Sequence, residues 1–308
     1  MDMSTDPTIA LLISESGKDV PHAIYRIPPG KCLMPETYLD QSERIRNLRV
    51  RPDDVWVITY PKCGTTWTQE MVWLMMNDFD FDLAKSSFLY HRSVFLEFNA
   101  IGGMLPDETE DSITRVEKAK SPRVIKSHLP IYLLPKQLFE VKPKIIYVYR
   151  NPKDVAVSFF HHHQAWLSYE GSMDHFVQAF LEDKVLYGSF WENVLEYWEM
   201  RDEPNVLFNT YEEMKKDLEG VAKRTADFLN VVIPEDVKRR FLDHLTFNSM
   251  KTNESVNYEK LLKKSKAGGF MREGVVGSWK TALSDKESNE IDVWSRSKIA
   301  NSNFPYNY

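Results

Sequence analysis

The sequence has little cysteine and no long hydrophobic run. It contains two cysteines, Cys32 and Cys63, among 308 residues and no CxxC motif, so a disulfide framework is not expected. No segment approaches the roughly 20 consecutive apolar residues that a membrane-spanning helix needs. The apolar run from Ile9 to Ile13 is too short for a secretory signal and lacks a basic flank. We therefore expect a soluble protein of a reducing compartment, the cytoplasm, that does not enter a membrane.

An excess of positive charge is also missing. Lysine and arginine total 39, aspartate and glutamate total 45, and the net charge is −6. This balance argues against a nucleic-acid-binding protein or a general binder of membrane surfaces. The 12 glycines and 16 prolines show no periodic spacing, which excludes a collagenous chain. An anion can still be bound, but only by a local group of cations and backbone donors.

The chain is 43% apolar and long enough for a sizeable core. We expect one domain over residues 1–308, on which about residues 1–50 pack as an irregular segment, because Pro28, Pro29 and Pro35 punctuate that stretch. Runs of β-forming residues alternate with helix-like segments, which predicts an α/β fold with a central, mostly parallel sheet flanked by helices. The expected strands cover residues 55–60, 123–126, 144–149 and 205–209, and the expected helices 67–76, about 154–167 and about 212–229.

Ligands of such sheets bind beyond the carboxyl ends of the strands, and Tyr60 to Trp67 (YPKCGTTW) lies at one of these ends. The free N–H groups and positive dipole end at a helix start attract anions. Gly64 lets the backbone approach a ligand, and Lys62 adds a full charge. Thr65 and Thr66 can cap the helix or donate hydroxyls. The lysine precedes the glycine, so the loop is not the nucleoside-triphosphate motif GxxxxGK[ST], and an ordinary capped turn is the alternative.

A second group with the chemistry of an anion site follows the strand 144–149. Arg150 closes that strand, and Ser158 lies in the next helix. Arginine can bind phosphate through two parallel hydrogen bonds, and a serine hydroxyl can add another. Taken alone, Arg150 would more often be the ion-pair partner of an aspartate or glutamate.

Several segments together resemble the cytosolic sulfotransferases, the family that uses 3′-phosphoadenosine 5′-phosphosulfate (PAPS). Thr59 to Trp67 is similar to the family's 5′-phosphosulfate loop TYPKSGTTW, and Lys126 to Pro130 (KSHLP) to its catalytic-histidine segment. Tyr149 to His161 is similar to its 3′-phosphate segment. Its C-terminal phosphate segment is matched by Phe270 to Gly274 and Gly277 to Lys280. The similarity covers most of the chain in the family's order, and the combination is specific although no single piece is.

The resemblance implies a P-loop-like sulfotransferase fold and transfer of the sulfuryl group of PAPS to a hydroxyl group. The second product would be adenosine 3′,5′-bisphosphate (PAP), and no metal is implied. The acceptor would be a small apolar phenol, steroid-like or other alcohol, as in detoxification or hormone metabolism. His128 would be the general base, because imidazole titrates near working pH. Lys126 would neutralise the transferring sulfuryl oxygens, and Lys62 the leaving phosphate oxygen.

The same resemblance assigns the donor-binding residues. Lys62, Thr65 and Thr66 would hold the 5′ end. Arg150, Ser158 and Arg272 would hold the 3′-phosphate.

Trp67 and Phe247 would stack on the adenine, whose edge Tyr211 would contact, although a tryptophan that begins a buried helix is usually core. The full set implied is Lys62, Cys63, Gly64, Thr65, Thr66, Trp67, Arg150, Ser158, Tyr211, Phe247, Met250, Arg272 and Gly274.

The tract His161-His162-His163 does not predict a metal site. Neighbouring residues on a helix point about 100° apart, so the three side chains cannot converge on one ion, and metal-binding spacings such as HExxH are missing. His161 matches a family position near the acceptor pocket, and His162 stands where the family often has an aromatic residue. The expected acceptor pocket is Phe81, His161, His162 and Phe270, of which the apolar members could equally be core.

The sequence departs from the family pattern at several places, including Leu245 for a usual threonine and Ser278 for a usual aspartate. Cys63 replaces the usual serine, and a thiol beside Lys62 at a helix start predicts a lowered pKa and sensitivity to oxidation. Glu273 stands where the family usually has lysine, which predicts weaker donor binding. The family's dimer segment, KxxxTVxxxE, lacks its Thr-Val pair after Lys280, so a monomer and a homodimer both stay open.

Other functions are weighed against sulfuryl transfer. A dehydratase of the same fold would sulfonate an allylic alcohol and then release sulfate, and the sequence does not separate the two. A kinase or NTPase would need the GK[ST] loop. A non-catalytic protein that binds a nucleotide or a lipophile is disfavoured by the intact His128, Lys126 and Lys62.

Overall fold

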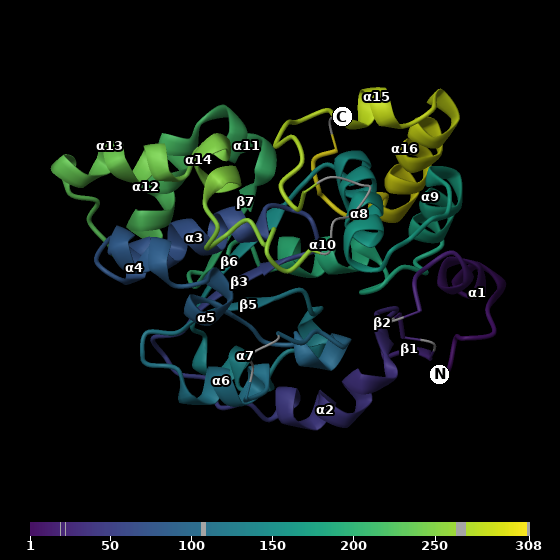
Figure 1. The fold of residues 1–308 in the computed structure, drawn as a ribbon, viewed down its shortest axis with the longest axis horizontal. Helices are drawn as coiled ribbons and strands as arrows, with labels where there is room; N and C mark the ends of the chain where they lie inside the picture. Colours follow the sequence, from purple (N-terminus) through teal and green to yellow (C-terminus); the bar gives the residue numbers. More distant parts are fainter. Residues whose placement is uncertain (19, 22, 106–108, 263–268, 307–308) are drawn as a thin grey trace.

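The computed structural model describes residues 1–18, 20–21, 23–105, 109–262 and 269–306 (Figure 1). Its central sheet has five strands in the order β4-β5-β3-β6-β7, and every neighbouring pair is parallel. The strands are β3 (Val55–Thr59), β4 (Val94–Phe95), β5 (Val124–Ser127), β6 (Lys144–Tyr149) and β7 (Val206–Thr210). The prediction of an α/β fold with a parallel central sheet is confirmed.

The expected strands agree with the observed ones to within a residue because each is a short run of apolar β-formers. The edge strand β4 was not predicted, since two residues give no periodic signal. All five residues of β3 are buried, as the middle strand of a sheet covered on both faces requires.

Helices cover both faces of the sheet, and the sheet divides the core in two. Trp56 and Ile58 of β3 belong to one cluster of buried side chains, and Val55 and Val57 to the other. In Figure 1, α12 to α14 lie near α3 and α4, whereas α8, α9 and α16 gather at the other end of the sheet. The helices are α1 (Pro7–Ser14), α2 (Glu36–Arg46), α3 (Thr65–Met76), α4 (Phe81–Ser86), α5 (Leu89–Arg92), α6 (Ser112–Lys118), α7 (Leu138–Val141), α8 (Pro152–Trp166), α9 (Met173–Leu181), α10 (Phe190–Glu199), α11 (Tyr211–Lys216), α12 (Leu218–Leu229), α13 (Glu235–His244), α14 (Phe247–Thr252), α15 (Trp279–Ala282) and α16 (Asp285–Ile299), with 3₁₀ turns η1 (Asn99–Ile101) and η2 (Ile131–Leu133).

The first 50 residues were expected to be irregular, and this expectation is wrong. They form α1, an antiparallel pair of strands, β1 (Ile24–Arg26) and β2 (Leu33–Pro35), and α2. The prolines begin and connect these elements rather than exclude them. Pro7 occupies the first turn of α1 behind its cap Asp6, and Pro35 is the residue that precedes α2.

The single helix expected from about 212 to 229 is two helices, α11 and α12. Asp217 separates them, because its side chain accepts a hydrogen bond from the N–H of Gly220 and caps α12. Helix α11 begins directly after β7. Tyr211 therefore lies at the carboxyl edge of the sheet, beside the loops that follow β3 and β6.

Candidate functional site

The loop between β3 and α3 presents backbone donors at the carboxyl edge of the sheet. Gly64 has φ +97° and is the residue before the helix, and a Cβ there would lie 2.9 Å from Cδ2 of Tyr211. Only glycine fits both conditions. Within the described part of the chain, the N–H groups of Thr65, Thr66 and Trp67 donate to no acceptor. These groups and the helix dipole form a site for an anion.

Lys62 stands in this loop with its amine turned toward α8. Its Nζ lies 3.4 Å from Nδ1 of His162 and 4.5 Å from the ring centre of Phe270. Partial burial lowers the pKa of Lys62 to about 7, and the nearby charges of Lys126 and Arg150 add to this effect. The cations therefore repel one another when no anion lies between them.

Arg150 is buried, with 7% of its surface exposed. Its Nη1 and Nη2 donate to the carbonyl oxygens of Lys62 and Val275, each at 3.2 Å. The guanidinium lies 4.2 Å from the ring centre of Tyr211, and its Nε has no hydrogen-bond partner. No carboxylate of the described ranges forms an ion pair with Arg150, so the expectation of an aspartate or glutamate partner is wrong.

His128 follows the last residue of β5 and is buried. Its Nδ1 lies 2.8 Å from the carbonyl oxygen of Thr59. A carbonyl only accepts hydrogen bonds, so Nδ1 carries the proton and Nε2 keeps a free lone pair. Burial, followed by the charge of Lys126, holds the pKa of His128 well below its usual value. The imidazole is therefore neutral and able to accept a proton at Nε2.

Lys126 and His128 share one aromatic neighbour. Nζ of Lys126 lies 3.8 Å from the ring centre of Phe95, and the His128 ring contacts the same ring edge-on at 5.2 Å. The two side chains are thus on the same side of the sheet edge, because residues two apart in an extended strand share a face. No carboxylate among the described residues makes an ion pair with Lys126 or Lys62.

The predicted adenine-binding rings lie around a further cation. The rings of Trp67 and Tyr211 meet edge-on at 5.8 Å. Lys215 approaches both predicted stacking rings, with its Nζ 5.7 Å from the ring centre of Trp67 and 6.0 Å from that of Phe247. Gly274 has φ +62°, and a Cβ there would lie 2.1 Å from the Phe247 ring, so the C-terminal segment packs closely on this ring.

The remaining residues implied for donor binding are partly buried, buried, or bonded to a neighbouring side chain. Arg272 is engaged by its neighbour, with Nη1 2.7 Å from Oε1 of Glu273. Ser158 is partly buried on α8. The Thr65 hydroxyl bonds that of Thr59 at 2.7 Å, and Met250 is the residue of α14 that is buried in the core.

On the acceptor side, His162 and Phe270 come together and Phe81 does not. The ring of His162 lies 6.4 Å from Phe270 and 5.9 Å from Trp166. Phe81 is instead buried in the core of α3, α4 and α13, where its ring contacts His244 edge-on at 5.5 Å. Phe81 is therefore a core residue, and the expectation that it lines the acceptor pocket is wrong.

The three consecutive histidines diverge, as helix geometry requires. Nδ1 of His161 lies 3.0 Å from Oε1 of Gln164, whereas Nδ1 of His163 donates to the carbonyl of Phe159 at 2.9 Å. Among the residues that the structure describes, no cluster of three or more His, Cys, Asp or Glu side chains could bind a metal ion.

The prediction of a reactive thiol at Cys63 is wrong. Cys63 is completely buried, and burial raises the pKa of its thiol above the usual value. The charges of Arg150 and Lys62 act in the opposite direction but are weaker than the cost of placing a thiolate in the core. The sequence showed the neighbouring charges but not the burial.

Sequence reasoning also missed Glu97, which is completely buried. Its Oε1 accepts a hydrogen bond from the N–H of His128 at 2.6 Å. The available signal was a lone acidic residue inside the apolar run Val94 to Phe98, since buried carboxylates need a reason to be there.

Comparison with known proteins places these features in one family. A family profile described as "Sulfotransferase domain" matches residues 52–303. Luciferin sulfotransferase of Photinus pyralis is 40% identical over 286 residues, covering 87% of this chain and 77% of that protein. Sulfotransferase 1E1 of Homo sapiens is 34% identical over 263 residues, covering 82% and 87%. Amine sulfotransferase of Oryctolagus cuniculus is 34% identical over 296 residues, covering 88% and 94%.

Solved structures resemble the whole chain. Retinol dehydratase in a complex with retinol and PAP superposes with a TM-score of 0.86 at 27% identity, covering 98% of this chain and 97% of the other. Mouse sulfotransferase SULT7A1 with PAP gives a TM-score of 0.72 at 25% identity, covering 91% and 95%. None of the described helices combines the length and apolar character that crossing a bilayer demands.

Proposed function

The chain belongs to the sulfotransferase family, and on that premise we propose that it transfers the sulfuryl group of PAPS to a small apolar alcohol. Phenols and steroid-like alcohols are the acceptors we expect, since two predicted pocket residues, His162 and Phe270, lie beside each other and beside the ring of Trp166. Relatives with solved structures bind retinol, androsterone or PAP, which supports both the donor and the apolar acceptor.

One observation carries the proposal. Lys62, Lys126 and Arg150 meet at the carboxyl edge of the sheet, and none of them forms an ion pair with a described carboxylate. The free N–H groups at the start of α3 adjoin them. Crowded cations of this kind are unfavourable until an anion neutralises them. A nucleotide with phosphate groups at both its 5′ and 3′ positions fits this arrangement, because Arg150 and Lys62 lie on different strand-helix loops.

PAPS supplies the activated sulfuryl group, and the protein supplies charge and a base. Nε2 of His128 accepts the proton of the acceptor hydroxyl, while the Nδ1–H bond to the Thr59 carbonyl keeps the ring oriented. Lys126 provides positive charge beside that base, and Lys62 stabilises the departing phosphate oxygen. Arg150, with Ser158 and Arg272, would hold the 3′-phosphate, and Trp67, Phe247 and Tyr211 the adenine.

Calorimetry tests the donor site before any acceptor is known. We expect PAP to bind and adenosine 5′-monophosphate, which lacks the 3′-phosphate, to bind at least about tenfold more weakly, because Arg150 then has no partner. A protein that ignores PAP, or that binds both nucleotides equally, contradicts the proposed donor.

Sulfuryl transfer to a panel of phenols, steroids and retinoids tests the base. His128→Ala should lower the rate by about 10²–10⁴-fold while PAP affinity stays within about twofold. His175→Ala is the matched control, since this histidine lies on α9, contacts Glu15 after α1 and is partly exposed. Undiminished transfer by His128→Ala would remove it as the base.

A dehydratase is the second candidate, because retinol dehydratase structures cover 98% of the chain. Product analysis with an allylic alcohol separates the two functions: a stable sulfate ester supports transfer alone, and an unsaturated hydrocarbon with free sulfate supports dehydration. The cytoplasmic location, the single domain over residues 1–308 and the choice between monomer and homodimer stay proposals, which cell fractionation, limited proteolysis and gel filtration test.

A further inference from the structure

Glu97 lies directly behind the residue that we propose as the base. The stretch after β4 continues beside β5, since the N–H of Leu96 donates to the carbonyl of Lys126 at 2.9 Å. This places the Glu97 carboxylate under the end of β5. Oε1 accepts from the N–H of His128 at 2.6 Å, and Oε2 accepts from the hydroxyl of Ser127 at 3.0 Å. The carboxylate therefore fixes two consecutive residues at the point where the strand ends.

The contacts of Glu97 are unusual for a buried acid. Its side chain is completely buried, yet no lysine, arginine or histidine of the described chain makes an ion pair with it. A carboxylate in this position is costly unless hydrogen bonds or nearby charge stabilise it. Burial raises the pKa of Glu97 to about 7, although its bonds to His128 and Ser127 and the charge of Lys126 oppose that rise. The carboxylate is therefore mostly ionised above pH 7.

Glu97 is also a source of negative charge close to the transfer site. Burial lowers the pKa of Lys126, and the charge of Glu97 acts against that decrease. Phe95, two residues before Glu97, contacts both Lys126 and His128. The titratable groups from other elements that feel the Glu97 charge are Cys32, Tyr38, Tyr187 and Tyr197.

We propose that Glu97 is a positioning residue of the transfer reaction: it fixes the main chain of His128 and supplies the buried negative charge that balances Lys126. The inference rests on the proposed function, because it assigns Glu97 a part in that same reaction. Glu97 touches neither reacting group, so it acts through His128 and Lys126. His128 is then held at two points. Its main-chain N–H donates to Glu97, and its Nδ1–H donates to the Thr59 carbonyl.

Glu97→Gln separates the charge from the hydrogen bonds. Glutamine still accepts from the His128 N–H but carries no charge, so Lys126 should lose its proton at a lower pH. We expect kcat at pH 7.5 to fall about tenfold and the alkaline limb of the kcat–pH profile to move down by about one unit. The KM for PAPS should stay within about twofold. Glu97→Ala also removes the hydrogen bonds, and we expect kcat to fall about a hundredfold.

Glu196→Gln is the matched control. Glu196 also accepts from a main-chain N–H, that of Ile131 at 2.9 Å, and burial raises its pKa as well. It makes no contact with His128 or Lys126. We expect its variant to keep the wild-type pH profile, which distinguishes a role in the reaction from a general effect of losing a buried carboxylate.

Nitrogen-15 NMR of the His128 ring gives a readout that needs no transfer reaction. The Nδ1–H form should dominate in wild type and in Glu97→Gln, and should mix with the Nε2–H form in Glu97→Ala. A Glu97→Gln enzyme with the wild-type rate and an unshifted pH profile would overturn the role of the charge. An unchanged ring in Glu97→Ala would overturn the positioning role. If wild type transfers no sulfuryl group, the proposed function fails, and the NMR result still decides whether Glu97 positions His128.

Discussion

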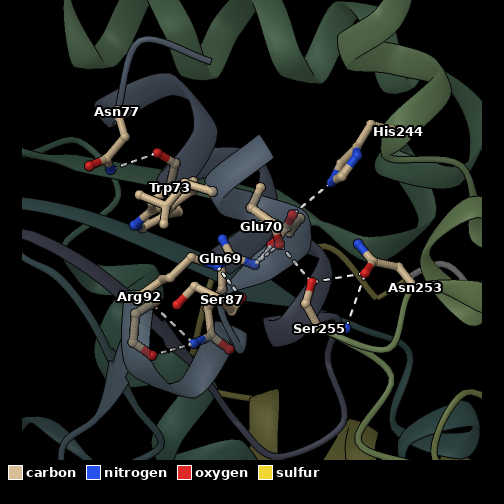
Figure 2. A network of polar contacts seen from close by, with 12 residues as sticks. Gln69, Glu70, Trp73, Asn77, Ser87, Arg92, His244, Asn253 and Ser255 are labelled. Carbon is tan, nitrogen blue, oxygen red and sulfur yellow. Dashed lines mark hydrogen bonds and ion pairs between the residues drawn. The ribbon is translucent and has the colours of Figure 1, made fainter. Parts of the chain in front are cut away.

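Buried charges on helix α3 and in the loop before it differ in whether they have partners. We call the face of α3 that carries Glu70 its back, and the loop before α3 that carries Lys62 its front. Behind the helix, Glu70 is completely buried and accepts from Nη2 of Arg92 at 2.8 Å and Nε2 of His244 at 2.7 Å (Figure 2). The guanidinium of Arg92 also lies 4.4 Å from the ring centre of Trp73. Figure 2 shows this network joining α3 to the segments that carry Arg92 and His244. Each of these charges has an opposite charge or an aromatic face beside it.

At the front of the same helix the described cations form no ion pair with a carboxylate. Lys62, Lys126 and Arg150 crowd around the loop before α3, and in the described ranges none makes an ion pair with a carboxylate. The charge of Glu97 acts on Lys126 from beyond ion-pair distance. We infer that the paired charges stabilise the fold and that the unpaired cations serve to bind an anionic ligand. The predictions below test whether the two regions respond differently to the same kind of substitution.

The largest effect is expected where the network behind α3 is broken. Glu70→Ala leaves Arg92 buried without its counter-charge, so we expect the free energy of unfolding to fall by about 3–5 kcal/mol. Denaturant unfolding measures it. Glu219→Ala is the control, because Glu219 pairs with Lys238 at the surface, where removal costs about 0–1 kcal/mol. Equal losses in the two variants would show that the buried pair is not special.

The opposite response is expected in front of the helix. Lys62→Met removes a cation that has no counter-charge, so the donor-free protein should be as stable as wild type or slightly more stable. Its affinity for PAP should fall by about 10- to 100-fold, because a charged hydrogen-bond donor to phosphate is lost. Calorimetry and thermal unfolding of the same sample measure both quantities.

Lys85→Met, on the exposed side of α4, controls for the loss of one lysine and should change neither property. A Lys62→Met protein that is several kcal/mol less stable would mean that Lys62 serves the fold. The distinction between the two sides of α3 would then be lost.

The sequence was a good guide wherever local chemistry decides the outcome. The β3–α3 loop and the strands on either side of it followed from apolar runs, Gly64 and the helix start. The same is true of the side on which Lys126 and His128 lie, because strand geometry fixes it. The family resemblance then added the order of the segments, which no single motif could supply.

The failures within the candidate site concern burial and distant partners. Cys63 was judged by its neighbours in sequence, but burial decides its pKa. Phe81 was assigned to the pocket because it is apolar, and only the packing of α4 on its neighbours shows that it is core. Glu97 and His128 are 31 residues apart, so no local pattern joins them. These quantities depend on the tertiary structure, which spacing along the chain does not encode.

The next effect follows from the lowered pKa of Lys62. In the free protein this pKa is about 7, and a bound anion raises it because negative charge favours the ammonium form. Between pH 7 and 9, binding of PAP must therefore draw in a proton. We expect affinity to be greatest near pH 7 and to weaken by up to about tenfold for each unit of pH above it.

Calorimetry in buffers of different ionisation enthalpy measures the proton uptake directly. Lys62→Met should abolish most of the uptake, whereas Lys85→Met should retain it. Constant affinity across this range, with no proton exchanged, would mean that Lys62 is already fully charged in the free protein. The contrast with the paired charges behind α3 would then not extend to protonation.

The smallest effect concerns Glu273, whose carboxylate contacts the predicted phosphate ligand Arg272. Glu273 pairs with Arg272 at 2.7 Å, and both side chains are partly exposed, so the pair itself contributes only about 0–1 kcal/mol. It nevertheless competes with a 3′-phosphate for the same guanidinium. Glu273→Gln removes the competitor and Glu273→Lys adds an attractive charge. We expect PAP affinity to rise by about twofold in the first and by up to about tenfold in the second.

The 3′-phosphate provides the internal control for this last prediction. Affinity for adenosine 5′-monophosphate should not change in either Glu273 variant, and the gain for PAP should shrink at high salt, since exposed charges are screened. Glu290→Lys, with the same charge change on α16 where Glu290 faces Lys286, should leave both nucleotides unaffected. A gain that also occurs with the monophosphate would place Arg272 elsewhere than at the 3′ position. Its contact with Glu273 would then belong with the surface ion pairs rather than with the cations that await the donor.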